Sequence, residues 1–116
     1  MPEKKFKIAG SDIKPVAEGH GGCMATDMIT VEGHKVGYMY REPSDFPEDS
    51  GWRFFSGKES EEYLEDVEHT TVYDVNTIAN YDEGIIPLLD SPIGSAFERR
   101  GWLRKFVAVP FEPAEE

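Results

Sequence analysis

The feature that most constrains the fold is a pair of strand-like segments joined by a loop that is too long for a tight turn. Residues 35–42, KVGYMYRE, place Tyr38 and Tyr40 on one side and Met39 on the other, which is the period of a β-strand. Residues 51–57, GWRFFSG, form a second candidate strand that is bounded by glycines. The intervening PSDFPEDS contains two prolines and exceeds the usual hairpin loop. We therefore predict an antiparallel strand pair with a mobile acidic loop between its members.

The other segments predict short elements in an irregular order. We expect strands within CMATDMITV, TTVYDV and WLRKFVAVPF (102–111), helices in ESEEYLEDV (59–67) and VNTIANY, and a helical turn in GSAFERR. Because strands and helices do not alternate regularly, a parallel doubly wound sheet is not expected. We predict the fold class α+β: a small single domain with a mainly antiparallel sheet and two or three short helices.

The two expected helices carry specific local predictions. In the first helix, Tyr63, Leu64 and Val67 form an apolar stripe that we expect to face the core. Asp74 directly precedes the second helix and is expected to cap its N-terminus. The second helix should bury one face, made of Val75, Ile78 and Ala79.

Composition along the chain suggests three parts. Residues 1–21 contain alternating lysines, Pro15 and the glycine-rich EGHGG, and they are expected to form a flexible N-terminal arm. Residues 22–110 hold the strand and helix patterns and should form the folded α+β domain. Residues 111–116, which contain a proline and three glutamates, are expected to form an acidic tail. A chain of 116 residues suits one compact domain of this kind.

The charge balance is strongly acidic. Twelve Lys and Arg residues stand against 23 Asp and Glu residues, which gives a net charge of -11. This charge opposes binding to a nucleic-acid backbone, which needs a basic surface. Two readings stay open, because the acidity can serve solubility alone or can attract a basic partner over a long range.

Targeting and redox signals are sparse. Cys23 is the only cysteine, so an intrachain disulfide cannot form, which fits a reducing compartment. The N-terminal MPEKKFKIAG lacks the apolar run of a secretory signal, and no segment is long and apolar enough to span a membrane. We expect a cytoplasmic protein with no membrane partner.

No motif for catalysis, cofactor binding or metal binding is present. Cys23 as a nucleophile would need a base, but His20, His34 and His69 have no recognisable spacing to it. The chain lacks H-x-x-x-H and C-x-x-C pairs, and DFPEDSG lacks the ligand order of a calcium loop. We predict no catalytic residue, no cofactor-binding residue and no metal ligand.

The strongest functional pattern is one-sided charge beside an aromatic strand. Between residues 59 and 74 there are seven acids and no Lys or Arg. Such a run can be an ordinary solvated helix face, yet interfaces also combine aromatic anchors with a charged rim. At least one side of strand 51–57 must belong to the core. We predict a partner-binding face formed by Asp45, Glu48, Asp49, Trp52, Arg53, Glu61, Glu62, Glu65 and Asp66.

These segments resemble a known family. KVGYMYREPSDFPEDSGWRFFSGKESEEYLED, followed by YDVNTIANYDEGIIPLLDSPIGSAFER, is similar to the bacterial immunity-protein-like family number thirty-three of polymorphic toxin systems, over roughly residues 22–100. The resemblance implies a small non-enzymatic α+β domain that binds and neutralises a cognate toxin. It supplies no catalytic residues.

We therefore expect a cytoplasmic binding protein, with a monomer favoured, that neutralises a basic toxin through an acidic, aromatic-bearing face. Residues that select the toxin would lie in the acidic loop and on the 59–68 segment. Two alternatives stay open. One is a small-ligand or enzymatic domain with a pocket near Arg53, Tyr73 and Asp74, and the other is a structural domain that homodimerises through edge strand 102–109.

Overall fold

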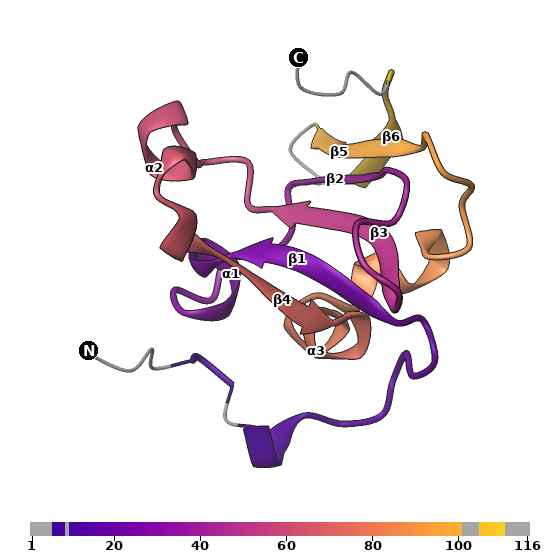
Figure 1. The fold of residues 1–116 in the computed structure, drawn as a ribbon, viewed down its shortest axis with the longest axis horizontal. Helices are drawn as coiled ribbons and strands as arrows, with labels where there is room; N and C mark the ends of the chain where they lie inside the picture. The colour runs from indigo at the N-terminus through magenta and orange to yellow at the C-terminus, as the bar shows by residue number, and fades with distance from the viewer. Residues whose placement is uncertain (1–5, 9, 101–104, 111–116) are drawn as a thin grey trace.

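The structure is a computed structural model that describes residues 6–8, 10–100 and 105–110. Its centre is a six-stranded sheet with the strand order β4-β1-β3-β2-β5-β6, which runs across Figure 1. The strands are β1 (Gly22–Thr26), β2 (Tyr38–Arg41), β3 (Asp49–Phe55), β4 (Thr70–Asp74), β5 (Ala96–Arg100) and β6 (Lys105–Ala108).

The sheet is mixed. β1 pairs in parallel with β3, whereas β1–β4, β2–β3, β2–β5 and β5–β6 are antiparallel. The predicted α+β class with a mainly antiparallel sheet is therefore confirmed. The parallel pair is a finding beyond the prediction. β1 is free to lie next to β3 because β2 occupies the other side of β3.

The predicted pair 35–42 and 51–57 is confirmed as β2 and β3. Tyr38 lies opposite Phe55, and Tyr40 lies opposite Arg53. The expected helical turn in GSAFERR is wrong, because this segment forms β5. Ala, Glu and Arg favour helices in isolation, but Phe97 pairs with Met39 of β2 and joins the core, so tertiary contacts decide its conformation.

The helices are short. They are α1 (Asp27–Thr30), α2 (Glu61–Glu65) and α3 (Val75–Tyr81), with 3-10 helices η1 (Gly10–Asp12), η2 (Val67–His69) and η3 (Glu83–Leu88). α3 begins as predicted, since the Asp74 carboxylate accepts a hydrogen bond from the Asn76 backbone N–H at 2.8 Å. The predicted apolar face of α3 is also confirmed, because Val75, Ile78 and Ala79 are fully buried.

The core fills one side of the sheet, which we call the α3 side. Strand residues such as Cys23, Met39, Trp52 and Phe54 point to this side and join α3 and η3 in one cluster. The Trp52 indole donates a hydrogen bond to the Leu89 backbone carbonyl at 3.2 Å. The opposite side, which we call the α2 side, carries the alternate residues of the same strands.

The described part of the expected arm, residues 6–8 and 10–21, runs along α3, below it in Figure 1. The Asn76 side-chain oxygen accepts from the backbone N–H groups of Val16 and Ala17, both at 2.8 Å, and its amide donates to the Lys14 carbonyl at 2.9 Å. Ala17 is buried. The described part of the arm is thus hydrogen-bonded to the domain, while the expected tail 111–116 lies outside the described residues.

No helix in the described part of the chain has the length and apolar character needed to cross a membrane.

Candidate interaction site

Successive side chains of strand β3 point to opposite sides of the sheet, so only some of them belong to the core. Trp52 and Phe54 are fully buried on the α3 side, and they stack on each other with ring centroids 6.0 Å apart. Arg53 and Phe55 lie between and beyond them, so alternation directs them to the α2 side. The aromatic strand is therefore partly core and partly the floor of the other side.

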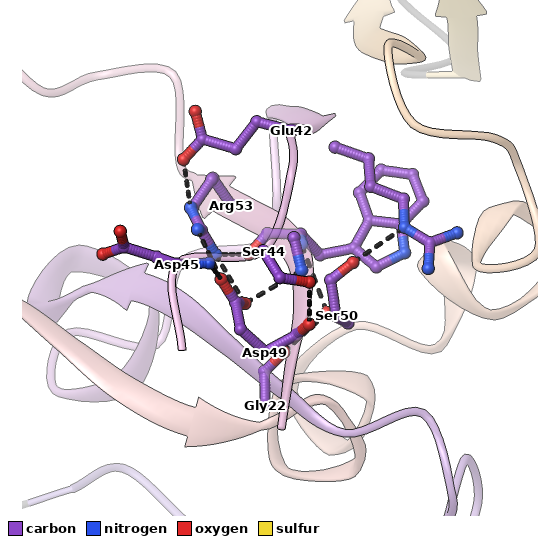
Figure 2. A network of polar contacts seen from close by, with 10 residues as sticks. Gly22, Glu42, Ser44, Asp45, Asp49, Ser50 and Arg53 are labelled. Atoms are coloured by element: carbon purple, nitrogen blue, oxygen red, sulfur yellow. Dashed lines mark hydrogen bonds and ion pairs between the residues drawn. The ribbon is translucent and has the colours of Figure 1, made fainter. Parts of the chain in front are cut away.

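Arg53 is held in a buried ion cluster (Figure 2). Its guanidinium donates to both Asp49 carboxylate oxygens, at 2.9 and 2.7 Å, and its Nε donates to Glu42 at 2.6 Å. Burial would lower the pKa of Arg53, but the hydrogen bonds with Asp49 and Glu42 raise it above its ordinary value. The hydrogen bond from Arg53 holds the pKa of Asp49 at about 2. Both groups therefore stay charged at neutral pH.

Asp49 also shapes the acidic loop before β3. Its carboxylate accepts hydrogen bonds from the backbone N–H groups of Asp45 at 2.7 Å and Gly51 at 2.8 Å. Gly51 has a φ of +91°, and a Cβ there would stand 2.0 Å from the Glu42 carbonyl oxygen, so the tight entry into β3 requires glycine. The contacts of Asp49 are those of a structural residue.

This geometry limits part of the predicted face. Asp49, Trp52 and Arg53 were expected to meet a partner, but their exposed fractions are 5%, 0% and 3%. Trp52 is needed to fill the core, and the two charged groups are needed to satisfy each other. These three side chains therefore add little exposed surface to the predicted face, and their contact with a partner stays a prediction.

The remaining predicted residues are exposed, but they form two separate groups. Asp45 and Glu48 lie in the loop at the start of β3, whereas α2 follows the end of β3. A seven-residue strand places its ends about 20 Å apart, and Figure 1 shows α2 beyond the arrowhead of β3. The second group consists of Glu61, Glu62, Glu65 and Asp66, all exposed on α2 and its C-terminal cap.

The expected inward stripe of the 59–67 helix is wrong for Leu64 and Val67, whereas Tyr63 is half-buried. Leu64 is 39% exposed and Val67 is 83% exposed, because the α-helix ends at Glu65 and Asp66 then caps a 3-10 turn. Tyr63 instead stacks on the His69 ring, with centroids 3.9 Å apart.

The α2 side of the sheet carries an aromatic cluster. Tyr40 and Phe55 stack with ring centroids 5.8 Å apart and planes inclined by 19°, and Tyr38 lies 5.8 Å from Tyr40 and 6.1 Å from Phe55. All three side chains are half-buried. The site prediction omitted Tyr38 and Tyr40, although the alternation in KVGYMYRE already placed them together on one side of a strand.

Two hollows are each lined by both Tyr40 and Phe55. The first, which we call the aromatic hollow, has a volume of about 310 Å³ and is lined by Tyr38, Tyr40, Phe55, Leu64, Glu59 and Glu98 together with Gly57. The second, of about 300 Å³, shares Tyr40, Phe55 and Leu64 and extends toward Met24, Glu42 and Arg53. Leu64 thus places α2, with its exposed acids, at the border of both hollows.

The carboxylates of the aromatic hollow differ in how firmly they are held. Glu59 accepts hydrogen bonds from the Ser56 N–H at 2.8 Å, from the Gly57 N–H at 3.0 Å and from the Thr26 hydroxyl. Burial opposes its ionisation, but these hydrogen bonds outweigh burial and lower the pKa of Glu59. Glu98 forms an ion pair of 2.9 Å with Arg100, and both side chains are well exposed.

The alternative pocket near Arg53, Tyr73 and Asp74 is not assembled. Arg53 lines the second hollow on the α2 side, whereas Tyr73 packs against the core cluster and borders a cavity of about 170 Å³ under the N-terminal segment. Asp74 is exposed and caps α3. The three residues therefore share no pocket in the described part of the chain.

The cysteine and histidines do not converge on a site either. Cys23 is fully buried in the core, and burial, followed by the nearby Asp74 charge, raises the pKa of its thiol. A thiol in this state is a poor nucleophile. Across residues 6–8, 10–100 and 105–110, no group of three or more His, Cys, Asp and Glu side chains is placed to hold a metal ion.

The fold and this site define a small α+β domain whose sheet has one side in the core and one side hollowed over aromatic rings. A model of the family described as the immunity protein Imm33 domain matches residues 23–108. The chain belongs to this family of immunity proteins, which confirms the resemblance and extends it through β6. The family implies a cognate toxin as partner. Neither the curated proteins nor the solved structures contain a match to the chain.

Proposed function

We propose that this chain neutralises a basic toxin in the cytoplasm by binding it, without catalysing a reaction, through the α2 side of its sheet. The family supports the toxin-neutralising role. The observation that carries the choice of surface is the pair of hollows over Tyr40 and Phe55, bordered by α2.

Half-buried aromatic side chains suit the centre of an interface. Tyr and Phe bury a large area while losing few rotamers, and interface energy concentrates at such residues. Here the Tyr40 and Phe55 rings are already stacked in the free protein, so binding need not order them. The floor of the hollow is thus pre-organised for a partner.

Acidic residues beside the rings suit the capture of a basic partner. Glu61, Glu62 and Glu65 are exposed on the same short helix as Leu64, which borders both hollows. Together with the net charge of -11, these groups would steer a positively charged toxin toward the rings. Complementary charge raises association rates, whereas buried anchors slow dissociation.

The test is co-expression in bacteria with each toxin domain encoded beside the gene. We expect the full chain to restore growth and to form a complex that survives gel filtration at micromolar concentration. A chain that is expressed and folded but neither restores growth nor binds any of these toxins would refute the proposed function.

A further inference from the structure

The aromatic hollow combines rings and carboxylates in a small space. Tyr38, Tyr40 and Phe55 form its apolar part, and Glu59 and Glu98 supply two carboxylates. Among the described residues that line it, none is Lys or Arg. This composition disfavours an anionic or purely apolar occupant and favours a cation that can lie against a ring.

The two carboxylates are suited to different tasks. Glu59 is fixed by three hydrogen bonds from Thr26, Ser56 and Gly57, so its charge has a set position. Among the described residues, Glu98 pairs with the exposed Arg100, and an exposed pair of this kind contributes little stability. Glu98 can therefore exchange its partner for an incoming cation at small cost.

The size of the hollow limits the occupant. A volume of about 310 Å³ lies at the lower end of ligand pockets, which suits one side chain rather than a folded segment. An Arg side chain offers an apolar stem for Leu64, a planar cation for the rings and N–H donors for carboxylates.

We propose that the aromatic hollow accepts a single Arg or Lys side chain that projects from the surface of the toxin. This inference rests on the proposed function, because it names the chemistry by which the same surface recognises its partner. It makes Glu98 and Phe55 specificity residues for a cationic anchor.

The test uses the full ¹⁵N-labelled chain and a probe in place of the toxin. Nα-acetyl-arginine methylamide is titrated into the protein and followed by NMR, with the isosteric but neutral citrulline derivative as the matched ligand control. The same titrations are run on Glu98→Gln and Phe55→Leu, with Glu83→Gln, an exposed site on η3, as the matched protein control. Urea midpoints establish that each variant is folded.

We expect the amide signals of Tyr38, Tyr40, Phe55 and Gly57 to shift, with arginine binding about tenfold more tightly than citrulline. Glu98→Gln and Phe55→Leu should each weaken arginine binding severalfold, and Glu83→Gln should not. Equal binding of the two probes, shifts that lie elsewhere, or a Glu98→Gln variant that binds arginine normally would overturn the inference.

The NMR titration and the co-expression experiment can fail independently of each other. If the chain restores growth but arginine does not bind the hollow, the cationic anchor is wrong and toxin neutralisation stands. If arginine binds the hollow but no toxin is neutralised, the hollow is a cation site and the proposed function is wrong.

Discussion

The Arg53 guanidinium holds the Asp49 carboxylate through two parallel hydrogen bonds, Nη1 to Oδ1 at 2.9 Å and Nη2 to Oδ2 at 2.7 Å. The two side chains are only 4% and 0% exposed. Paired geometry of this kind is the strongest form of ion pair in proteins. The ion pair joins the start of β3, where Asp49 also binds the acidic loop, to Arg53, which lines the second hollow. The acidic loop and the second hollow therefore depend on the same contact.

Removal of Asp49 should strongly destabilise the fold. Asp49→Ala leaves a buried guanidinium with only the Glu42 carboxylate, and breaking a buried pair costs about 3–5 kcal/mol. Urea denaturation measures the free energy of unfolding. Asp45→Ala is the control, because that side chain is exposed and only its backbone N–H reaches Asp49. A loss below about 1 kcal/mol for Asp49→Ala would contradict the structural role.

Acid should remove part of the stability that Asp49 provides. The pKa of Asp49 is lowered from 3.8 to about 2 in the folded chain, so this contribution is fully present above about pH 4 and is lost as the pH falls toward about 2. Its size is about 2 kcal/mol. Unfolding free energies of the wild type and Asp49→Asn should therefore converge between about pH 4 and about pH 2. A difference that stays constant over this range would exclude the linkage.

Asn76 should anchor the N-terminal segment. In Asn76→Ala, the N–H group of the buried Ala17 loses its acceptor, which costs about 1–3 kcal/mol, whereas the Val16 N–H keeps the Lys14 carbonyl at 2.9 Å. We expect hydrogen exchange at the Ala17 amide to accelerate at least about tenfold, and exchange at Val16 to accelerate less, because each 1.4 kcal/mol of lost protection is a factor of ten. The Met24 amide within the sheet serves as the internal control. Unchanged exchange at Val16 and Ala17 would show that the contact is not needed.

Charge on α2 should set the rate of toxin capture. The triple reversal Glu61→Lys, Glu62→Lys and Glu65→Lys should lower the association rate constant at low salt by about tenfold or more, with a smaller effect at high salt. The matched control reverses Asp12, Glu18 and Glu83, which are exposed, lie outside α2 and both hollows, and change the net charge equally. Stopped-flow kinetics with the toxin compare the two. Equal rates in both triple variants would assign the effect to net charge alone.

Local patterns in the sequence were sufficient for several elements. The alternation in KVGYMYRE and the glycine-bounded GWRFFSG identify β2 and β3, and Asp74 identifies the start of α3. These signals depend on residues close to one another in the chain. They predict elements and caps, but they carry no information on which strands become neighbours.

The rest depends on long-range contacts. The parallel pairing of β1 with β3 joins segments separated by α1 and β2, and β5 is a strand because Phe97 meets Met39. From the sequence alone, Arg53 is expected to be a surface charge. In the structure it is buried in ion pairs with Asp49 and Glu42. The same is true of the candidate site, because Leu64 and Glu98 reach the hollow from distant elements.

The most direct test of the account is the affinity of the cognate toxin for variants of the α2 side, measured by biolayer interferometry. Tyr40→Ala removes a ring that lines both hollows, and Ile93→Ala removes an apolar side chain that is 55% exposed and lies outside both. We predict a loss of about thirtyfold or more for Tyr40→Ala, the effect of an interface hot spot, and no change for Ile93→Ala. Wild-type affinity in a folded Tyr40→Ala variant would contradict the claim that this surface binds the toxin.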